Sequence, residues 1–303
     1  MAKKKSKKVI PYTFDDVQNF EDNIYGMSRN MVRSILGSPA IRSWSALQNR
    51  IFVCLISKIK WKTSGNSNVI EVRIDDFVRE LGWDINNVDS RKVAYVIRDE
   101  LSYMFDHCDV SAQDPYSGKY YEGPLILEHE GDSQYIQVAV NKRLMPHFEK
   151  LYNVARTTGV PFIPFFKPEV LNFRCKYSKA LLEEFKSCCK TGGAINEHCL
   201  TTKQLKELFG LERGNYMREY DPVTDTYSKF DRANFEKNVL FPAIKELNQT
   251  CMIEILPYED TYFEKEKFHG KVTGYIFKYR VYDLEEMKKV AALKLNSIIA
   301  TND

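Results

Sequence analysis

The sequence predicts an α+β fold built from two tandem winged-helix domains. A length of 303 residues suits two domains of ordinary size, and a hydrophobic content of 44% is sufficient for packed cores. One order of elements, namely helix, strand, helix, helix and hairpin, occurs twice along the chain, and it is typical of the winged helix. We therefore expect a basic N-terminal arm at 1–27, domains at 28–155 and 156–282, and a C-terminal helix at 283–303.

The first copy begins at Leu47–Trp61, where apolar residues recur at helical spacing. After a strand at 69–74, Asp75 is placed to cap a short helix that stops at Gly82. Ser90–Met104 is the next predicted helix, with four apolar residues facing inward: Val93, Ile97, Leu101 and Met104. Two strands, at 125–128 and 135–140, complete this copy.

The second copy repeats the order. Its predicted elements are a helix at 177–189, an extended piece at 194–200, a helix at 201–210, a long helix at 228–248, and strands at 251–258 and 271–281. Thr201 is placed to cap the short helix, and Gly210 ends it as Gly82 ends its counterpart. Between the copies a helix is predicted from Asn141 to about Val154, before a proline-rich stretch. A capping box of Asp283 and Glu286 predicts the last helix.

Composition excludes several classes of protein. No run approaches the ~18 apolar residues that cross a bilayer, and no apolar stretch follows the N-terminal lysines, so we expect a soluble cytoplasmic protein without membrane contact. The seven cysteines contain no CxxC pair, and His198 beside Cys199 is a lone pair of potential ligands. We therefore predict no metal and no cofactor, in a reducing compartment.

The net charge of the chain says little about which kind of molecule it binds. The formal net charge is +3, and the five lysines among residues 3–8 exceed it, so the remaining chain sums to −2. The lysine-rich arm is equally consistent with a tether to phosphate and with a solubilising tail. Any basic surface must therefore come from the arrangement of the charges.

Enzymatic motifs are missing from the sequence. There is no glycine-rich phosphate loop followed by lysine, and no paired-histidine metal motif. The five histidines occur singly, and the pairs Asp15–Asp16 and Asp75–Asp76 lie where helices are expected to begin, so capping explains them. We predict a protein that is not an enzyme.

The first candidate recognition helix presents a polar face. Arg91, Lys92, Tyr95 and Arg98 share it at spacings of three and four. Arginine can make paired hydrogen bonds to guanine or to phosphate, which makes this face a candidate for contact with double-stranded DNA. The alternative is an ordinary solvated helix face.

The second candidate helix, Ser228–Asn248, has an apolar stripe and an opposite polar face. Further candidates for DNA contact lie in this helix, in the loop before it and in the following wing: Arg213, Asn215, Arg218, Lys229, Arg232, Asn234, Lys237, Asn238, Lys245 and Lys271. Among them Lys237 lies at the edge and Arg232 nearer the core. Asparagine suits adenine because its amide donates and accepts at once. Pro242 is expected to kink the helix.

The segment Asn234–Asn248 resembles the hallmark of plasmid replication initiators that bind iterons, which are directly repeated origin sites. That family shows Asp-Phe, basic residues, Val-Leu, Pro-Ala-Ile and Glu-Ile-Asn, followed by a hairpin, and Cys251–Val281 fits the hairpin. Residues 177–183 and 200–211 are similar to two further family segments, and Leu47–Phe52 matches less closely. Glu236 and Asn238 depart from the pattern, because many relatives carry Arg or Lys there.

The resemblance implies a function. Members bind repeated sites with one winged helix per major groove, promote origin opening, and recruit the host initiator and helicase. Some form a homodimer through the first domain. Two alternatives stay open: a tandem winged-helix transcriptional regulator without a replication role, which would bind only a promoter, and an enzyme of nucleic-acid metabolism, which would cleave or join DNA.

Overall fold

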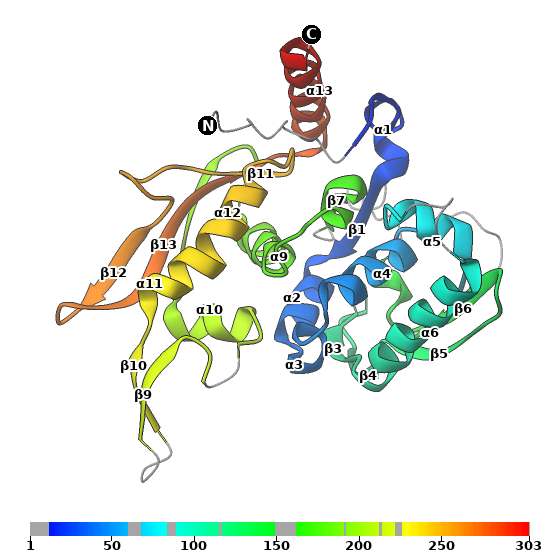
Figure 1. The fold of residues 1–303 in the computed structure, drawn as a ribbon, viewed down its shortest axis with the longest axis horizontal. Helices are drawn as coiled ribbons and strands as arrows, with labels where there is room; N and C mark the ends of the chain where they lie inside the picture. Colours follow the sequence, from blue (N-terminus) through cyan, green and yellow to red (C-terminus); the bar gives the residue numbers. More distant parts are fainter. Residues whose placement is uncertain are drawn as a thin grey trace.

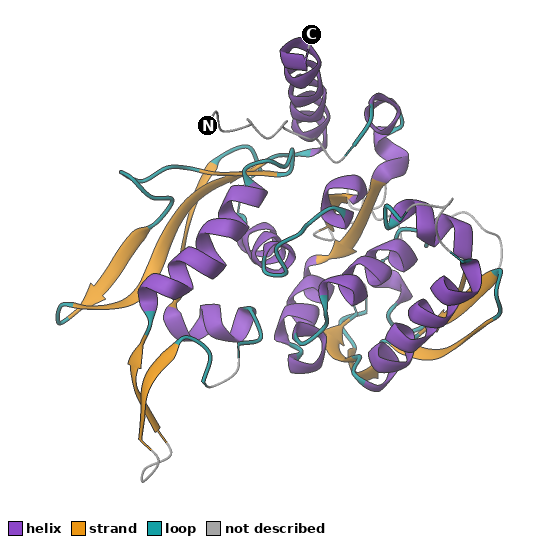
Figure 2. Cartoon of the chain, in the orientation of Figure 1, coloured by secondary structure: helices purple, strands orange, loops and turns teal. Residues whose placement is uncertain are grey.

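The computed structural model describes residues 12–59, 68–83, 89–114, 117–148, 162–190, 192–211, 214–221 and 226–302 (Figure 1). Within these residues, helices and small antiparallel sheets form two modules, flanked by a C-terminal helix (Figure 2). We call residues 46–140 the first module and residues 178–281 the second module.

The first module has the predicted winged-helix order. Its elements are α4 (Ala46–Ile56), β2 (Val69–Arg73), α5 (Ile74–Glu80), α6 (Ser90–Asp106), β3 (Asp109–Gln113), β4 (Tyr120–Pro124), β5 (Ile126–Gly131) and β6 (Tyr135–Val140). Strands β2 and β5 pair with opposite edges of β6. Helices α4 and α6 pack together, and Ile51, Ile97 and Leu101 on them are fully buried. The apolar faces predicted for these helices therefore form the core.

Capping signals explain where these helices begin and end. The Asp89 carboxylate accepts the Arg91 backbone N–H at 3.0 Å and starts α6. Gly82, with a φ of +69°, ends the turn after α5 as predicted. The sequence predicts Asp75 as the cap of α5, and this is wrong: Arg73 holds the N-cap position without a side-chain bond. Asp75 lies in the first turn, where the helix dipole favours a carboxylate.

The second module repeats the arrangement. Its elements are α9 (Ser178–Cys188), β8 (Ile195–Thr201), α10 (Thr202–Leu208), β9 (Met217–Asp221), β10 (Thr226–Phe230), α11 (Arg232–Phe235), η3 (Glu236–Leu240), α12 (Phe241–Leu247), β11 (Ile253–Ile255), β12 (Glu264–Phe268) and β13 (Lys271–Val281). Strand β8 pairs with one edge of β13, while β11 and β12 pair with it on the other side. This pairing matches that of β2, β6 and β5, so the predicted repeat is confirmed at the level of topology.

Two stretches, one inside the first module and one directly after it, differ from prediction. The sequence predicts a helix from Asn141, but the Asn141 side chain accepts the Arg143 backbone N–H at 3.0 Å in a turn. Only the short 3-10 helix η2 (Met145–His147) follows in the described residues, and 149–161 lie outside them. The hairpin of β3 and β4 is not predicted, and its strand β3 packs against α2 (Arg29–Gly37).

Two segments join the modules, one before the first module and one between the two modules. The connecting elements are α1 (Phe14–Gln18), η1 (Phe20–Asn23), β1 (Ile24–Ser28), α3 (Pro39–Arg42), β7 (Phe162–Phe166) and α8 (Lys167–Leu171). Strands β1 and β7 pair with Gly26 opposite Pro164, and α2 packs against α9. Arg29 Nη2 donates to the Cys189 carbonyl at 3.1 Å. The predicted arm at 1–27 is therefore folded from Tyr12 onward, and residues 1–11 lie outside the described part.

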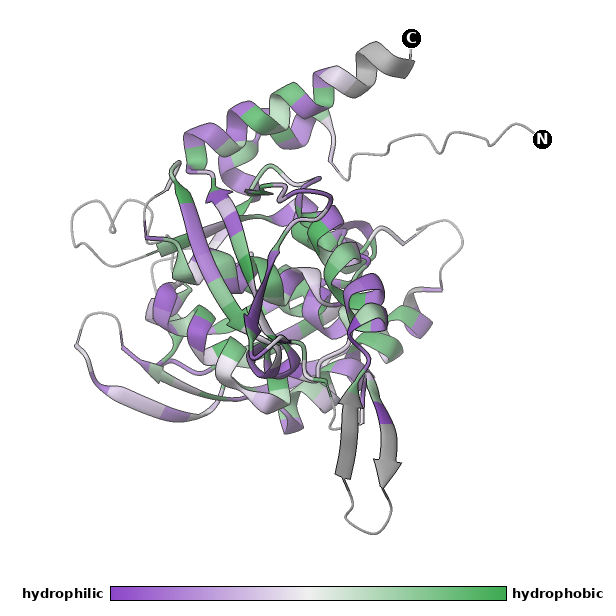
Figure 3. Ribbon diagram, turned by 90° about the vertical axis from the view of Figure 1, so that its left-hand side faces the viewer, coloured by the Kyte–Doolittle hydropathy of each residue, from purple (hydrophilic) through white to green (hydrophobic). Residues whose placement is uncertain are grey.

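Helix α13 (Leu284–Asn302) begins with the predicted capping box. Asp283 Oδ1 accepts the Glu286 N–H at 2.8 Å, and Glu286 Oε2 accepts the Asp283 N–H at 3.0 Å. The helix packs through Met287 and Ala291 near its start, and it lies along the top of the molecule in the view of Figure 3. Among the described residues, no helix combines the length and the apolar character that crossing a bilayer requires.

Candidate nucleic-acid interface

Elements α11, η3 and α12 run on from one another, and we call them together the second recognition helix. The predicted helix start at Ser228 is wrong, because residues 226–230 form strand β10. The helix begins after Asp231, whose carboxylate accepts the Asn234 backbone N–H at 3.4 Å. Its predicted apolar stripe is confirmed, since all five members have no exposed surface: Phe235, Val239, Leu240, Ile244 and Leu247.

The second recognition helix continues through Pro242 because the turn before the proline is wider than an α-helical turn. Proline has no N–H to offer to the carbonyl four residues earlier. The turn Glu236–Leu240 before it is π-helical, and the Phe241 N–H bonds to the Glu236 carbonyl. Such a turn holds one extra residue, so it rotates the residues beyond it around the axis. The predicted disturbance at Pro242 therefore takes the form of a π-helical turn.

Four predicted contact residues lie on the exposed side of the second recognition helix: Asn234, Lys237, Asn238 and Lys245. Asn234 Nδ2 already donates to Asp231 Oδ2 at 2.6 Å. Arg232 is half-buried, in agreement with its predicted place near the core. Lys237, Asn238 and Lys245 thus form the accessible part of this face, with two positive charges and one amide.

The hairpin of β9 and β10 stands at the start of the second recognition helix (Figure 1). Arg218 Nε donates to Asp231 Oδ2 at 2.7 Å, so the residue that caps the helix also ties the hairpin to it. Asn215 is exposed just before the hairpin, and Lys229 lies on β10. Arg213 lies outside the described residues.

A wing follows, formed by β12 and β13, with His269 and Gly270 at its turn in the left-handed region (φ +47° and +75°). Lys267 and Lys271 are exposed on it. Lys265 Nζ instead lies 2.8 Å from Glu236 Oε2 on the second recognition helix. The wing therefore offers two free basic positions beside the helix, and one that fixes the wing to it.

The first module places its predicted residues on α6. Arg91, Lys92 and Tyr95 are exposed, and Tyr95 retains 68% of its surface. Arg98 is half-buried, and its Nη1 donates to the Gly131 carbonyl at 3.3 Å. Three of the four residues are thus open to solvent, and the fourth is bonded to the last residue of β5.

The first wing, formed by β5 and β6, is acidic. Glu128, Glu130 and Asp132 are exposed along it. Asp132 is engaged locally, because its carboxylate accepts the backbone N–H groups of Gln134 and Tyr135 at 2.6 and 2.9 Å. Carboxylates repel DNA phosphates, so this wing counteracts the attraction that the basic residues of α6 exert on DNA. Sequence reasoning missed this feature, although the acidic residues are evident in the segment.

The face of the second module is therefore the stronger candidate for contact with nucleic acid. It combines lysines on a helix and on its wing with an exposed asparagine. These groups can contact phosphate and read a base edge.

Comparisons with known proteins agree with the two-module organisation. The family model of the initiator replication protein WH1 domain matches residues 35–186, and that of the initiator Rep protein WH2 domain matches 201–279. The fold is similar to the Pi initiator protein, solved in complex with iteron DNA, with 13% identity, a TM-score of 0.58, and coverage of 86% of this chain and 98% of that chain. Domains 2 and 3 of RctB are more distant, at 11% identity, a TM-score of 0.41, and coverage of 78% and 82%.

No curated protein matches the chain in sequence. The two family models nevertheless span both modules, and the predicted family resemblance and fold class are confirmed. The chain belongs to the initiator replication protein family and contains its two winged-helix domains.

Proposed function

We propose that this protein initiates plasmid replication by binding directly repeated origin sites through its two modules. The observation that carries the proposal is the exposed face of Lys237, Asn238 and Lys245 in the module that matches the family's second winged-helix domain. The similar fold of the Pi initiator, which was solved with iteron DNA, supports this class of site.

The two modules contribute unequally in this proposal. The second recognition helix enters a major groove, with Lys267 and Lys271 of the wing near the backbone. Helix α6 enters a neighbouring groove with Arg91 and Lys92, against the repulsion of its acidic wing. The second module therefore supplies most of the affinity, and the first module mainly sets the length of the site.

Binding of this kind leads to the rest of the proposed role. The bound protein promotes opening of the origin and recruits the host initiator and helicase in the cytoplasm, without a catalytic step of its own. A homodimer through the first domain is part of the same proposal. Each of these steps depends on DNA binding, so the first experiment addresses binding together with replication.

The experiment pairs footprinting on the parent plasmid with maintenance of a minimal replicon. We expect protection of direct repeats, and we expect Lys237→Ala to weaken the protection and to reduce plasmid maintenance. Lys289→Ala, on the exposed side of α13, is the matched control and should retain both. Protection confined to a promoter, with maintenance unaffected by Lys237→Ala, would instead favour a transcriptional regulator.

A further inference from the structure

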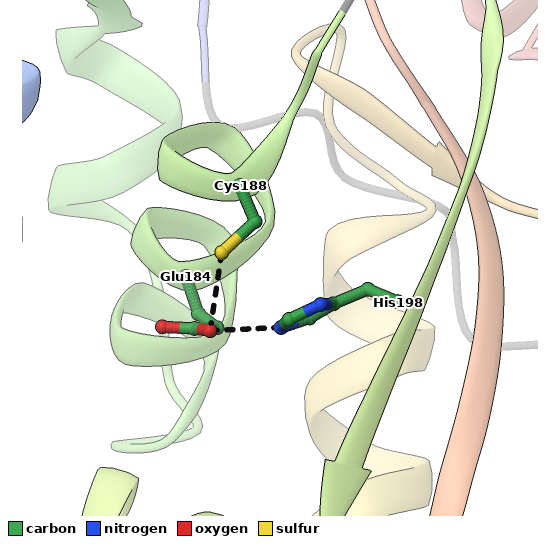
Figure 4. Close-up of side chains that lie close together, drawn as sticks. All are labelled: Glu184, Cys188 and His198. Atoms are coloured by element: carbon green, nitrogen blue, oxygen red, sulfur yellow. Dashed lines mark hydrogen bonds and ion pairs between the residues drawn. The ribbon is translucent and has the colours of Figure 1, made fainter.

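Three potential metal ligands converge in the second module, and none of them belongs to the candidate DNA-contacting face described above. Glu184 and Cys188 extend from α9, and His198 extends from β8 toward them (Figure 4). His198 Nε2 lies 2.9 Å from Glu184 Oε1, and Cys188 Sγ lies 3.4 Å from the same oxygen. The three ligand atoms all lie within 4.8 Å of one another.

Local structure explains why these side chains meet. Glu184 and Cys188 are four residues apart on a helix, so they share one face. Successive residues of a strand point to opposite faces, so His198 faces α9 while Cys199 points away from it. Phe185 contacts the His198 ring edge-on, with ring centroids 6.4 Å apart, and so supports its orientation.

We propose that Glu184, Cys188 and His198 form a binding site for one Zn²⁺-type cation, with water as the fourth ligand. A thiolate, an imidazole and a carboxylate are the groups that zinc selects in proteins. Ligand bonds of about 2.0–2.3 Å in a tetrahedron place ligand atoms roughly 3.3–3.8 Å apart. Two of the observed separations are 2.9 and 3.4 Å, and the third is at most 4.8 Å, so side-chain rotations would have to bring the three atoms to these spacings.

The exposure of the site fits one open position. The side chains of His198 and Glu184 retain 23% and 19% of their surface, so a cation and a water molecule can reach them. The site joins α9 to β8, the strand that leads into α10 and pairs with β13. A bound cation would therefore link the first helix of the module to its sheet, and its expected effect is on stability.

Hydrogen bonding without a metal is the competing explanation. The contacts with Cys188 and Glu184 raise the pKa of His198 to about 9. A protonated imidazole and a carboxylate can hold one another as an ion pair, with the thiol beside them. The two explanations differ in what happens when a metal ion is added, and in which side chains that response requires.

The test uses the full chain, freed of metal and kept reduced. Co²⁺ is added first, because thiolate ligation gives an absorption band that hydrogen bonding alone cannot produce, and Zn²⁺ is then used to displace it. We expect one Co²⁺ per chain, displacement by Zn²⁺, and a higher melting temperature with Zn²⁺. Cys188→Ser should remove the thiolate band and weaken Zn²⁺ binding by about 100-fold or more. Loss of a group that only supports a metal ligand typically weakens binding by about 10–100-fold, so a larger loss is expected for a direct ligand.

Matched control variants distinguish metal binding at this site from metal binding by other side chains of the protein. Cys199→Ser, one residue from His198 on the opposite face of β8, should bind as the wild type does. His198→Asn provides a second disrupted variant, and circular dichroism verifies that each variant is folded. Failure of the wild type to bind Co²⁺ or Zn²⁺, or unchanged binding in folded Cys188→Ser and His198→Asn, would overturn the proposal.

Discussion

Glu236 accepts a hydrogen bond from the Tyr275 hydroxyl at 3.1 Å, which joins the second recognition helix to the strand that carries the wing. Its other carboxylate oxygen accepts from Lys265 Nζ at 2.8 Å. Glu236 is only 8% exposed, at a position where the family resemblance places a basic residue. Its role is therefore to fix the wing against the helix, and it does not point at DNA.

Glu236→Ala should destabilise the second module, because it leaves the buried Tyr275 hydroxyl without its acceptor. Loss of a buried hydrogen-bond partner costs about 1–3 kcal/mol. Urea unfolding measures this loss, and Glu236→Gln, which retains an acceptor for Tyr275, should recover most of it. An alanine variant as stable as the wild type would mean that the contact with Tyr275 does not stabilise the wing.

Lys237→Ala and Lys245→Ala should each weaken DNA binding and reduce its dependence on salt. Each neutralised phosphate contributes a log–log slope of roughly −0.9, so the loss of one contact should flatten the slope by about that amount. Affinity is measured across a salt series, with Lys289→Ala as the control. Unchanged affinity and slope for Lys237→Ala would show that this side of the helix does not face DNA.

Asn238→Ala should relax the choice of base at one position of the site. Its amide is exposed, whereas the Asn234 amide already donates to Asp231, so Asn238 is the better candidate for adenine. The expected loss is about 1–3 kcal/mol of discrimination, confined to that position. Binding to a set of single-base variants of the site tests it, with Gln249→Ala as a control beyond the helix.

Glu130→Lys should strengthen DNA binding if the first module contacts DNA, because it replaces repulsion of phosphate with attraction. Glu285→Lys on α13 adds the same charge away from α6 and is the matched control. Equal responses to the two charge reversals, Glu130→Lys and Glu285→Lys, would argue against a DNA contact by the first module.

Arg98→Ala should weaken DNA binding, as the sequence predicts. Because Arg98 bonds to the Gly131 carbonyl, we expect this effect to act through the first wing.

Mild acid should destabilise the protein through His147. This residue is buried beside Ser28 Oγ at 2.6 Å, and burial lowers its pKa to about 4. An unfolded histidine has a pKa of about 6.5, so between these values the unfolded chain binds the extra proton. The free energy of unfolding should therefore fall as pH drops through this window, by at most about 1.4 kcal/mol per pH unit.

The comparison of the wild type with His147→Asn isolates that effect. Glu169 acts in the opposite direction, because burial raises its pKa to about 7 and its contribution is lost as pH rises toward that value. Glu169 is present in both proteins, so its effect cancels in the difference. Urea midpoints across the pH range should be less acid-sensitive in His147→Asn, and equal acid sensitivity would exclude His147 as the cause.

Periodicity was sufficient to predict the core of the second recognition helix, because the stripe from Phe235 to Leu247 is long and regular. Its first residue is not predicted, because residues 226–230 pair with β9 in a hairpin, and the sequence predicts no strand at 217–221. The signal for the correct start was Asp231, three residues before Asn234. The carboxylate of Glu236 is held by Lys265 and Tyr275 on distant strands, and helix periodicity does not reveal such contacts.

Spacing rules also could not reveal the cluster of Glu184, Cys188 and His198. Its members include a carboxylate and come from two elements, α9 and β8, so no familiar cysteine–histidine spacing results. The acidic first wing was visible in the sequence, but its exposure alongside α6 required the pairing of β5 with β6.

Selection of bound sites from random DNA tests the central claim most directly. Two modules that enter successive major grooves should select a site with contacts about 10–10.5 bp apart, and Asn238→Ala should change one base of it. A selected site that covers a single groove would contradict the account, because it would leave one module without a role in DNA binding.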